Sequence, residues 1–428
     1  MADKKLSTES YKGVRDFYPE DMAIQRYIFD TWSHTAESFG YERYDASVLE
    51  PSELYKSKGA ENEELVNEQT YTFIDRGDRE VTLRPEMTPT VARMVAAKKR
   101  DLSFPVRWYS IPNLFRYERM QRGRLREHWQ LNCDLFGAED YTADVEMIAL
   151  AYHTLINFGA TPEIFAIRVN HRGFMETLFK EYGVTDADKI TTLTRLIDRK
   201  DKMPTAEFRE AVTDLVPPSR AEEFITTIDG RDEGILDSIG SDTHLQSVLA
   251  GLRDLGIENV IFSPSLARGF DYYTGTIFEI FDTSEENNRA LLGGGRYDNL
   301  TGLFGGDAIS GIGFGMGDVT MRDFLETHDL LIAPITSPTL VILPTEVSLN
   351  LEAEKLAQTF RTAGISVSVD LSDRKVGKKI SAADKALVSS VIILGEDEVK
   401  HGTYTLKHLA EGTEGSGTAE ELIEKIMN

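Results

Sequence analysis

The spacing of hydrophobic residues predicts a long helix followed by a strand near the start of the chain. In residues 22–39 the apolar side chains recur every three or four positions, and Gly40 follows the last of them. This period places them on one face of a helix, and glycine commonly ends a helix. Residues 41–50 are typical of a strand, which we expect to stop at Pro51 because proline cannot donate to a β-ladder.

Alternating apolar positions further along predict an antiparallel sheet. Residues 70–85 resemble a hairpin whose turn is Asp75-Arg76-Gly77-Asp78. Residues 106–115 and 129–136 indicate two neighbouring strands, joined by the arginine-rich segment 119–127. A helix is predicted over residues 142–158, and further strands near Val260 and over residues 276–281.

Changes in this pattern indicate the domain organisation. Residues 172–256 are rich in leucine and predicted to be mostly helical, which favours an inserted helical domain over residues 171–258. It divides an α+β domain into two parts, residues 1–170 and 259–330. After a proline-containing linker at 332–338, strands and helices alternate, as is typical of an α/β domain over residues 335–428; the segments are 340–343, 351–363, 365–369, 378–388 and 391–394.

Composition narrows the class of protein. No run of apolar residues approaches the roughly 20 that a membrane span needs, and the N-terminus lacks the apolar core of a secretion signal. We therefore expect a cytoplasmic protein without membrane contact. Cys133 is the single cysteine, which excludes an intramolecular disulfide and a cysteine zinc cluster, and no metal site is predicted among the side chains.

The charge is strongly uneven along the chain. The net charge of −24 argues against a non-specific nucleic-acid binder, yet residues 93–126 carry ten Lys and Arg against two acidic residues. A polyanion can bind such a segment. The alternative interpretation is a solvated basic face.

The segment 115–130 combines side chains suited to ATP. Arg116 forms a planar fork for phosphate oxygens, Glu118 can accept from an exocyclic amine, and Trp129 can stack on a purine. The alternative is an exposed ion pair on a sheet. A second segment, Leu83 to Thr88, places Glu86 after a strand-ending proline, where it can receive an ammonium group or cap a helix start.

Three glycine-containing segments complete the candidate chemistry. Residues 268–275 read Arg-Gly-Phe-Asp-Tyr-Tyr-Thr-Gly, which neither an ordinary strand nor a turn requires. Gly293-Gly294-Gly295 and the run from Gly311 to Gly317 bring backbone close to a flat or anionic group. They lack the Gly-Lys-Ser/Thr ending of a P-loop.

In this order and spacing, these segments resemble the class II histidyl-tRNA synthetases over nearly the whole chain. Residues 12–19 resemble the N-terminal signature, and the first helix with the strand ending at Pro51 resembles motif 1, which implies a homodimer. Residues 115–134 resemble motif 2, and residues 268–275 with 294–298 resemble the histidine-specific motifs. Residues 370–375 and 393–398 resemble the anticodon-binding domain.

The resemblance implies an antiparallel sheet flanked by helices, and an enzyme that uses ATP and Mg²⁺ to join L-histidine to tRNA(His). It also implies residue roles. The residues implied to bind histidine are Glu86, Met87, Thr88, Gln130, Asp134, Tyr272 and Tyr273. Of these, Glu86 and Thr88 contact the α-amino group, Gln130 contacts the carboxylate, and Asp134 and Tyr273 contact the imidazole. For ATP, the resemblance implies that Arg116 and Arg268 contact the α-phosphate and that Glu118 and Trp129 contact adenine.

Two positions depart from the family pattern. Asp134 stands where the family usually carries glutamate, which is one methylene longer. A water molecule bridging Asp134 to the imidazole is therefore an alternative to direct contact. Thr320 stands where motif 3 usually carries an arginine on the γ-phosphate. Arg322, Arg296 and an arginine of the loop after Arg116 are the alternatives for that charge.

The missing arginine also favours a second hypothesis, a synthetase-like regulatory subunit of histidine biosynthesis without catalysis. The retained Glu86, Arg116, Gln130, Arg268 and Tyr273, and a C-terminal domain that such a regulator does not require, favour the enzyme.

Because Arg268 is assigned to the reacting phosphate, we predict that Arg268→Ala abolishes adenylate formation and leaves tRNA binding largely unchanged. Pyrophosphate exchange and filter binding of tRNA measure the two effects. An equal loss of both would show that Arg268 is structural.

Overall fold

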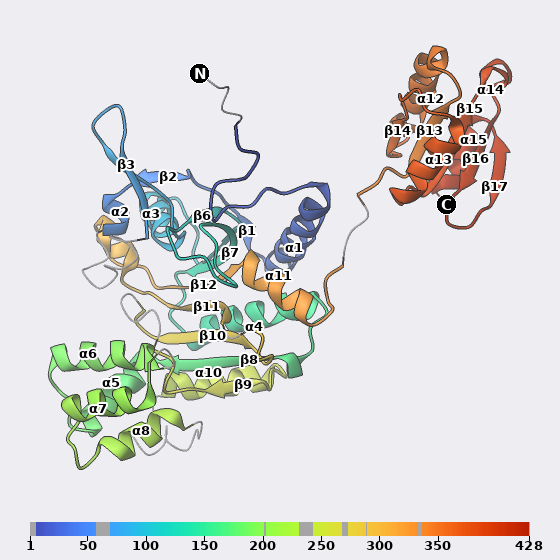
Figure 1. Cartoon of the computed structure of the whole chain (residues 1–428). Coiled ribbons are helices and arrows are strands. Elements are labelled where there is room, and N and C mark those ends of the chain that lie inside the picture. The colour runs from blue at the N-terminus through green and yellow to red at the C-terminus, as the bar shows by residue number, and fades with distance from the viewer. Residues whose placement is uncertain are drawn as a thin grey trace. The chain divides into compact units, whose positions relative to one another are not determined.

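A computed structural model describes residues 6–56, 69–200, 203–230, 243–267, 273–287, 289–332 and 336–427. The chain forms two compact units, Met1–Ile332 and Ala333–Asn428 (Figure 1). Residues 333–335 of the predicted linker lie outside the described ranges. Within those ranges, no helix is both long enough and apolar enough to cross a membrane.

The first unit is built on a large mixed sheet, nine-stranded over the described residues, with the order β1-β5-β7-β12-β11-β10-β8-β9 and β6 paired to β7. Its pairs are antiparallel except β1–β5 and β8–β9, which confirms the predicted class of fold. The strands are β1 Glu42–Arg43, β5 Val106–Ser110, β6 Asn113–Phe115, β7 Glu127–Phe136, β8 Phe165–His171, β9 Val260–Phe262, β10 Thr276–Asp282, β11 Ala290–Arg296 and β12 Gly311–Gly317.

Three helices pack against one face of the centre of this sheet: α1 Pro19–Ser38, α4 Tyr141–Asn157 and α11 Asp318–Thr327 (Figure 1). Helix α1 turns Ile28, Trp32 and Ala36 inward at a four-residue spacing, and all three are fully buried. This spacing keeps them on one face of the helix, so the predicted helix is confirmed with an earlier start.

A small three-stranded sheet lies beside the large one and confirms the predicted hairpin. Strands β3 Tyr71–Ile74 and β4 Glu80–Leu83 pair antiparallel around the Asp75 turn, and β2 Leu49–Pro51 pairs with β4. Short helix α2 Glu53–Lys56 follows, and α3 Thr88–Lys98 begins just after Glu86.

Two predicted strands are wrong in their extent. Residues 41–50 do not form one strand, because β1 pairs with β5 of the large sheet while β2 pairs with β4 of the small one. Residues 106–115 divide at Pro112 into β5 and β6. Proline has no N–H to donate, so the ladder with β7 is interrupted there.

Residues 172–254 are helical wherever they are described, apart from their turns. The helices are α5 Arg172–Glu181, α6 Ala187–Asp198, α7 Thr205–Leu215, α8 Ala221–Asp229 and α10 Thr243–Asp254. They leave the large sheet after β8 and return at β9, its parallel neighbour. Helix α10 packs on α4, where Gly251 lies against Val145.

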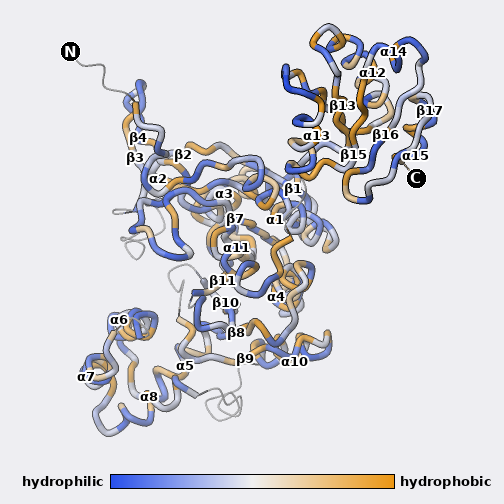
Figure 2. Tube along the Cα trace, turned by 45° about the vertical axis from the view of Figure 1, so that its right-hand side comes forward, coloured by the Kyte–Doolittle hydropathy of each residue, from blue (hydrophilic) through white to orange (hydrophobic). Residues whose placement is uncertain are grey.

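The second unit is an α/β fold with sheet order β14-β13-β15-β16-β17. Figure 2 shows β13 and β15 as strongly apolar, and they form its core. The predicted alternation ends at residue 394, whereas the sheet continues with two antiparallel strands. The elements are β13 Leu340–Pro344, α12 Asn350–Thr362, β14 Val367–Val369, α13 Val376–Lys385, β15 Ser390–Leu394, α14 Glu396–His401, β16 Tyr404–His408, β17 Glu414–Gly417 and α15 Ala419–Met427.

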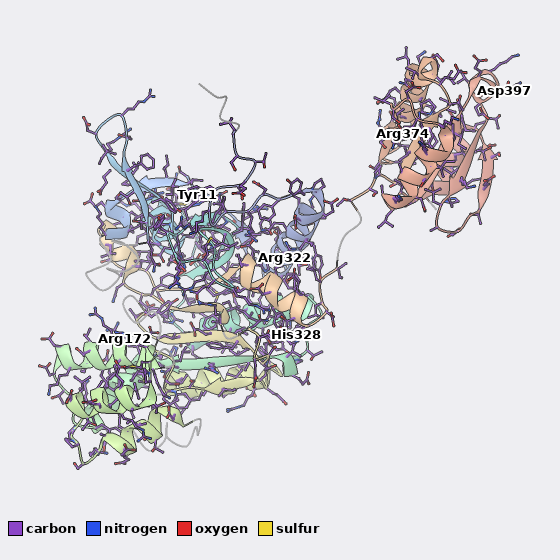
Figure 3. The ribbon with its side chains drawn as sticks, in the orientation of Figure 1. Tyr11, Arg172, Arg322, His328, Arg374 and Asp397 are labelled. Carbon is purple, nitrogen blue, oxygen red and sulfur yellow. The ribbon has the colours of Figure 1, made fainter. Side chains whose placement is uncertain are left out.

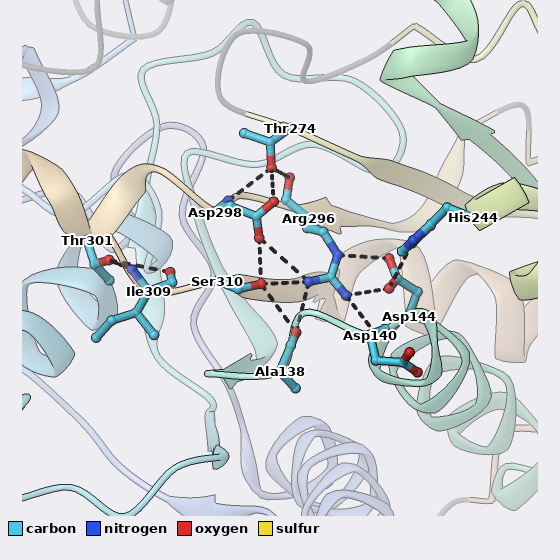
Figure 4. Close-up of polar contacts among 10 residues, drawn as sticks. All are labelled: Ala138, Asp140, Asp144, His244, Thr274, Arg296, Asp298, Thr301, Ile309 and Ser310. Carbon is cyan, nitrogen blue, oxygen red and sulfur yellow. Dashed lines mark hydrogen bonds and ion pairs between the residues drawn. The ribbon is translucent and has the colours of Figure 1, made fainter. Parts of the chain in front are cut away.

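A buried ion pair joins β11 to α4 (Figure 4). Asp144 is fully buried and accepts two hydrogen bonds from Arg296, which also donates to Ser310 Oγ at 2.6 Å and to the Ala138 carbonyl at 2.9 Å. Burial alone would raise the pKa of Asp144, but hydrogen bonds from His244 and Arg296 hold it below its ordinary value. The guanidinium is thereby fully engaged away from solvent.

Because removing one partner leaves a buried charge uncompensated, we predict that Asp144→Ala lowers the unfolding free energy of the first unit by about 3 to 5 kcal/mol. The control is Asp140→Ala, which removes only the N-cap of α4 and costs about 1 kcal/mol. All three tryptophans lie in the first unit, so their fluorescence during urea unfolding reports this unit alone. Equal losses in the two variants would contradict the role of the pair.

Candidate active site

Strand β7 supplies the central polar residues of the candidate site. Its side chains alternate, so Leu131 and Cys133 enter the core beneath α1 while Gln130, Asn132 and Asp134 face the other way. The neighbouring strand β12 pairs Gly313 with Asp134 and Gly315 with Asn132.

The glycines of β12 form a floor without side chains beneath these polar groups. A Cβ on Gly313 would lie 2.6 Å from Asp134 Oδ1, and one on Gly315 would lie 2.7 Å from Gln130 Cδ. Both distances are far below van der Waals contact, so only glycine allows Gln130 and Asp134 to lie flat over the strand. The sequence predicts no secondary structure for the two glycine runs. In the structure they belong to β11 and β12, two central strands of the sheet.

Above this floor lies a cavity that we call the inner cavity. It brings together five residues that the sequence placed at the histidine and the phosphate: Glu86, Thr88, Arg116, Gln130 and Tyr273. Asn132 and Tyr297 complete the polar wall. These residues come from five separate segments of the chain, which the sheet and the start of α3 hold side by side.

A second, outer cavity shares Arg116, Gln130, Gly293 and Gly315 with the inner one. Its further lining includes Glu118, Arg124 and His128 of the motif 2 segment, Glu279 and Arg289 of the β10–β11 region, and Thr320 of α11. The two cavities are therefore one connected region with a glycine floor.

Arg116 is held between the two cavities by backbone and carboxylate groups. Its Nε donates to the Pro85 carbonyl at 2.8 Å, next to Glu86, and its Nη1 lies 4.0 Å from Glu118 Oε1. Glu118 is buried and pairs with Arg124 at 2.9 Å. Arg116 lines both cavities.

Asp134 is buried next to Tyr297 and does not line either cavity. The Tyr297 hydroxyl donates a short hydrogen bond to Asp134 Oδ1 and itself lines the inner cavity. Burial raises the pKa of Asp134 to about 7, although the hydrogen bond from Tyr297 favours the carboxylate. Tyr297 thus stands as the polar group between the cavity and Asp134.

Both units of the chain match known protein families. Residues 13–318 match the family model of histidyl-tRNA synthetase, and residues 331–428 match that of an anticodon binding domain. The chain belongs to the histidyl-tRNA synthetase family. It is 42% identical to the histidine–tRNA ligase of Leptospira biflexa over 436 aligned positions, covering 100% of this chain and 99% of that relative. It is 37% identical to that of Thermoplasma volcanium, with 98% of both chains covered.

Solved structures agree with this assignment. The crystal structure of histidyl-tRNA synthetase from Nostoc sp. PCC 7120 superposes with a TM-score of 0.81 at 25% identity and covers 99% of both chains. A Bacillus halodurans structure described as an ATP phosphoribosyltransferase regulatory subunit/histidyl-tRNA synthetase has a TM-score of 0.75 and covers 92% of this chain and 99% of its own. At 24% identity, that likeness shows the fold alone.

Not every predicted site residue reaches the cavities of this synthetase fold. Trp129 faces the opposite side of β7 and packs edge-on against Phe17, with ring centroids 5.3 Å apart, and against Phe29 of α1. Met87 is fully buried just before α3 and lines neither cavity. Arg268 and Tyr272 lie outside the described residues.

The aromatic ring that does line the outer cavity belongs to His128. His128 lies two residues before Gln130 on β7, so the two side chains face the same side of the sheet. Desolvation, followed by the nearby charges of Arg116, Arg15 and Arg124, lowers the pKa of His128 to about 3. A neutral imidazole ring therefore lies beside Arg116 and Glu118, where the sequence had placed Trp129. Strand alternation is the signal that distinguishes the two.

At the position of motif 3, the chain carries a buried carboxylate, Asp318, and an uncharged hydroxyl, Thr320. Asp318 is fully buried and accepts from Arg15 at 2.6 Å, from Gln25 at 2.9 Å and from the Trp129 backbone N–H at 2.9 Å. Thr320, in the first turn of α11, lines the outer cavity but carries no charge.

Two of the three proposed sources for the missing charge are engaged elsewhere. Arg296 is buried in its pair with Asp144. Arg322 points toward α1, where it contacts Asp21 at 3.3 Å as well as Glu326 at 2.8 Å (Figure 3). Neither lines the cavities, whereas Arg289, which no sequence pattern singled out, lines the outer one.

Burial of Asp134 generates a prediction about pH. The folded state holds a proton on Asp134 up to a pH of about 7, whereas the unfolded chain releases it near the ordinary value of 3.8. The folded state therefore binds more protons between these values, and stability falls as the pH rises from about 4 to about 7. The loss is on the order of 4 kcal/mol, and Asp134→Asn should abolish it.

The measurement is the urea midpoint of tryptophan fluorescence at pH 4.5 to 8.5 for the wild-type protein and Asp134→Asn. The difference between the two should grow as the pH rises and then become constant above about 7. Parallel curves would contradict the assigned pKa.

Proposed function

We propose that this chain is a histidine–tRNA ligase. It activates L-histidine with ATP to histidyl-adenylate and pyrophosphate, then transfers histidine to the 3′ end of tRNA(His). The observation that carries the proposal is the inner cavity, where Glu86, Thr88, Arg116, Gln130 and Tyr273 converge over a glycine floor. Family membership over both units supports the same activity.

In the activation step, the Glu86 carboxylate and the Thr88 hydroxyl receive the α-ammonium group of histidine, and the Gln130 amide orients its carboxylate. That carboxylate attacks the α-phosphate of ATP in line, and pyrophosphate leaves. Arg116, with Arg268, stabilises the negative charge that develops on the phosphate oxygens. The residues position the reactants, and no covalent nucleophile is needed.

Adenine lies in the outer cavity, where Glu118 accepts from its amino group and the neutral His128 ring contacts its face. The buried Glu279 carboxylate lines the same cavity and has the oxygen ligand chemistry that Mg²⁺ prefers, so Glu279 would hold this ion, which would offset the charge of the triphosphate.

Selectivity for histidine rests on the imidazole. Tyr273 and Tyr297 line the inner cavity and their hydroxyl groups serve the two imidazole nitrogens, and Asp134 acts through Tyr297, whose hydroxyl it holds. An amino acid of similar size without these nitrogens would leave the buried groups unpaired, which disfavours it strongly.

The proposed enzyme has three domains. Residues 1–170 and 259–330 form the catalytic domain, 171–258 the helical insertion and 335–428 the anticodon-binding domain for tRNA(His). The enzyme acts as a homodimer in the cytoplasm. The alternative, a regulatory subunit without catalysis, is favoured only by the uncharged Thr320.

Histidine-dependent exchange between ATP and labelled pyrophosphate tests the activity. The wild-type protein should exchange with histidine and not with other amino acids. Glu86→Gln should raise the KM for histidine about 10- to 100-fold, because it removes a charged partner of the ammonium. Glu207→Gln, an exposed position on α7, is the control. A folded wild-type protein that shows no exchange would overturn the enzyme in favour of the regulator.

A further inference from the structure

The wall of the outer cavity carries an uncharged residue, Thr320, where α11 begins. The family usually carries an arginine at this position, and here Thr320 donates its hydroxyl to backbone carbonyls, to Gly317 at 3.1 Å and to Leu291 at 3.2 Å. A triphosphate bound in the proposed pose would meet a neutral side chain there. Its terminal phosphates carry most of the charge, so another cation must lie nearby.

The side chain of Arg289 lies at this same place. Its Cδ is 3.1 Å, and Thr320 Cγ2 is 3.2 Å, from the point where a Cβ on Gly123 would stand. The two side chains therefore meet over Gly123, the glycine in the loop of motif 2. Arg289 lines the outer cavity together with Thr320, Arg116 and Arg124.

The sheet explains why residue 289 reaches residue 320. Strands β11 and β12 pair with Leu292 opposite Met316, so the start of β11 lies beside the end of β12. Helix α11 begins directly after β12, and the bond from Thr320 to the Leu291 carbonyl fastens its first turn to β11. The register of β11 with β12 therefore brings Arg289, the residue just before β11, beside the first turn of α11.

Two arginines of the motif 2 loop, Arg122 and Arg124, are less suited to this role. Arg124 lies 2.9 Å from the buried carboxylate of Glu118. Arg122 is 54% exposed, lies 3.8 Å from Glu286 and does not line the outer cavity.

We propose that Arg289 is the residue that binds the terminal phosphates of ATP in this protein and replaces the arginine absent at Thr320. This inference rests on the proposed function for its substrate and adds a residue that no sequence motif singled out. The planar guanidinium offers two parallel donors to phosphate oxygens. Arg289 contacts oxygens of the leaving pyrophosphate, while Arg116 contacts oxygens of the α-phosphate that reacts.

The test compares the affinity for a triphosphate with that for a monophosphate. Isothermal titration with α,β-methylene-ATP and with AMP is performed on the full-length wild-type protein, Arg289→Ala, Arg289→Lys and the control Arg322→Ala. Arg289→Ala should weaken the analogue about 10- to 100-fold and leave AMP unchanged, because AMP lacks the terminal phosphates. Arg289→Lys should lose less, and Arg322→Ala should match the wild type.

A charge-relocation variant sharpens the result. Arg289→Ala combined with Thr320→Arg returns the guanidinium to the helix position and should recover most of the lost affinity. Unchanged analogue binding in Arg289→Ala, or equal losses for the analogue and AMP, would overturn the assignment. So would a wild-type protein that binds the analogue no more tightly than AMP. If the analogue depends on Arg289 but exchange with histidine is absent, the inference stands and the proposed activity is wrong.

Discussion

The close approach of polar side chains to the glycine strand β12 is the constraint on which the site depends. Gln130 and Asp134 lie so near Gly315 and Gly313 that a single methyl group on either glycine would collide with them. A strand this poor in side chains contributes little packing of its own on that face. It is stable because it lies in the middle of the sheet, with β7 and β11 satisfying its backbone on both edges.

Buried charges fix the elements around this strand. Asp318, at the end of β12, joins the N-terminal Arg15, the first helix through Gln25 and the backbone of β7. Arg296, at the end of β11, joins α4 through Asp144. Each charge is paired and receives further hydrogen bonds, the condition under which burial is tolerated. Both anchors lie outside the cavities, so the groups that face the substrates are not consumed in holding the fold.

Sequence reasoning found most elements and many of the residues that converge on the inner cavity, because hydrophobic period and motif order are local properties. It erred where a property depends on the partner strand. Residues 41–50 and 106–115 were taken as single strands, although their halves pair with different strands or are divided by Pro112. It also placed Trp129 and Gln130 in one site, although adjacent residues of a strand face opposite sides.

Tertiary contacts explain why Arg289 was not found. No motif surrounds it, and its relation to Thr320 exists only through the register of β11 with β12. The physical chemistry of helix ends makes this relocation reasonable. The first turn of α11 carries the positive end of the helix dipole, where a guanidinium is disfavoured and where Asp318 already supplies a negative charge. An arginine at the start of β11 delivers a cation to the same cavity wall without standing on that helix end. The position of a charge in the cavity can therefore be preserved while the residue that provides it moves from the first turn of α11 to the residue before β11.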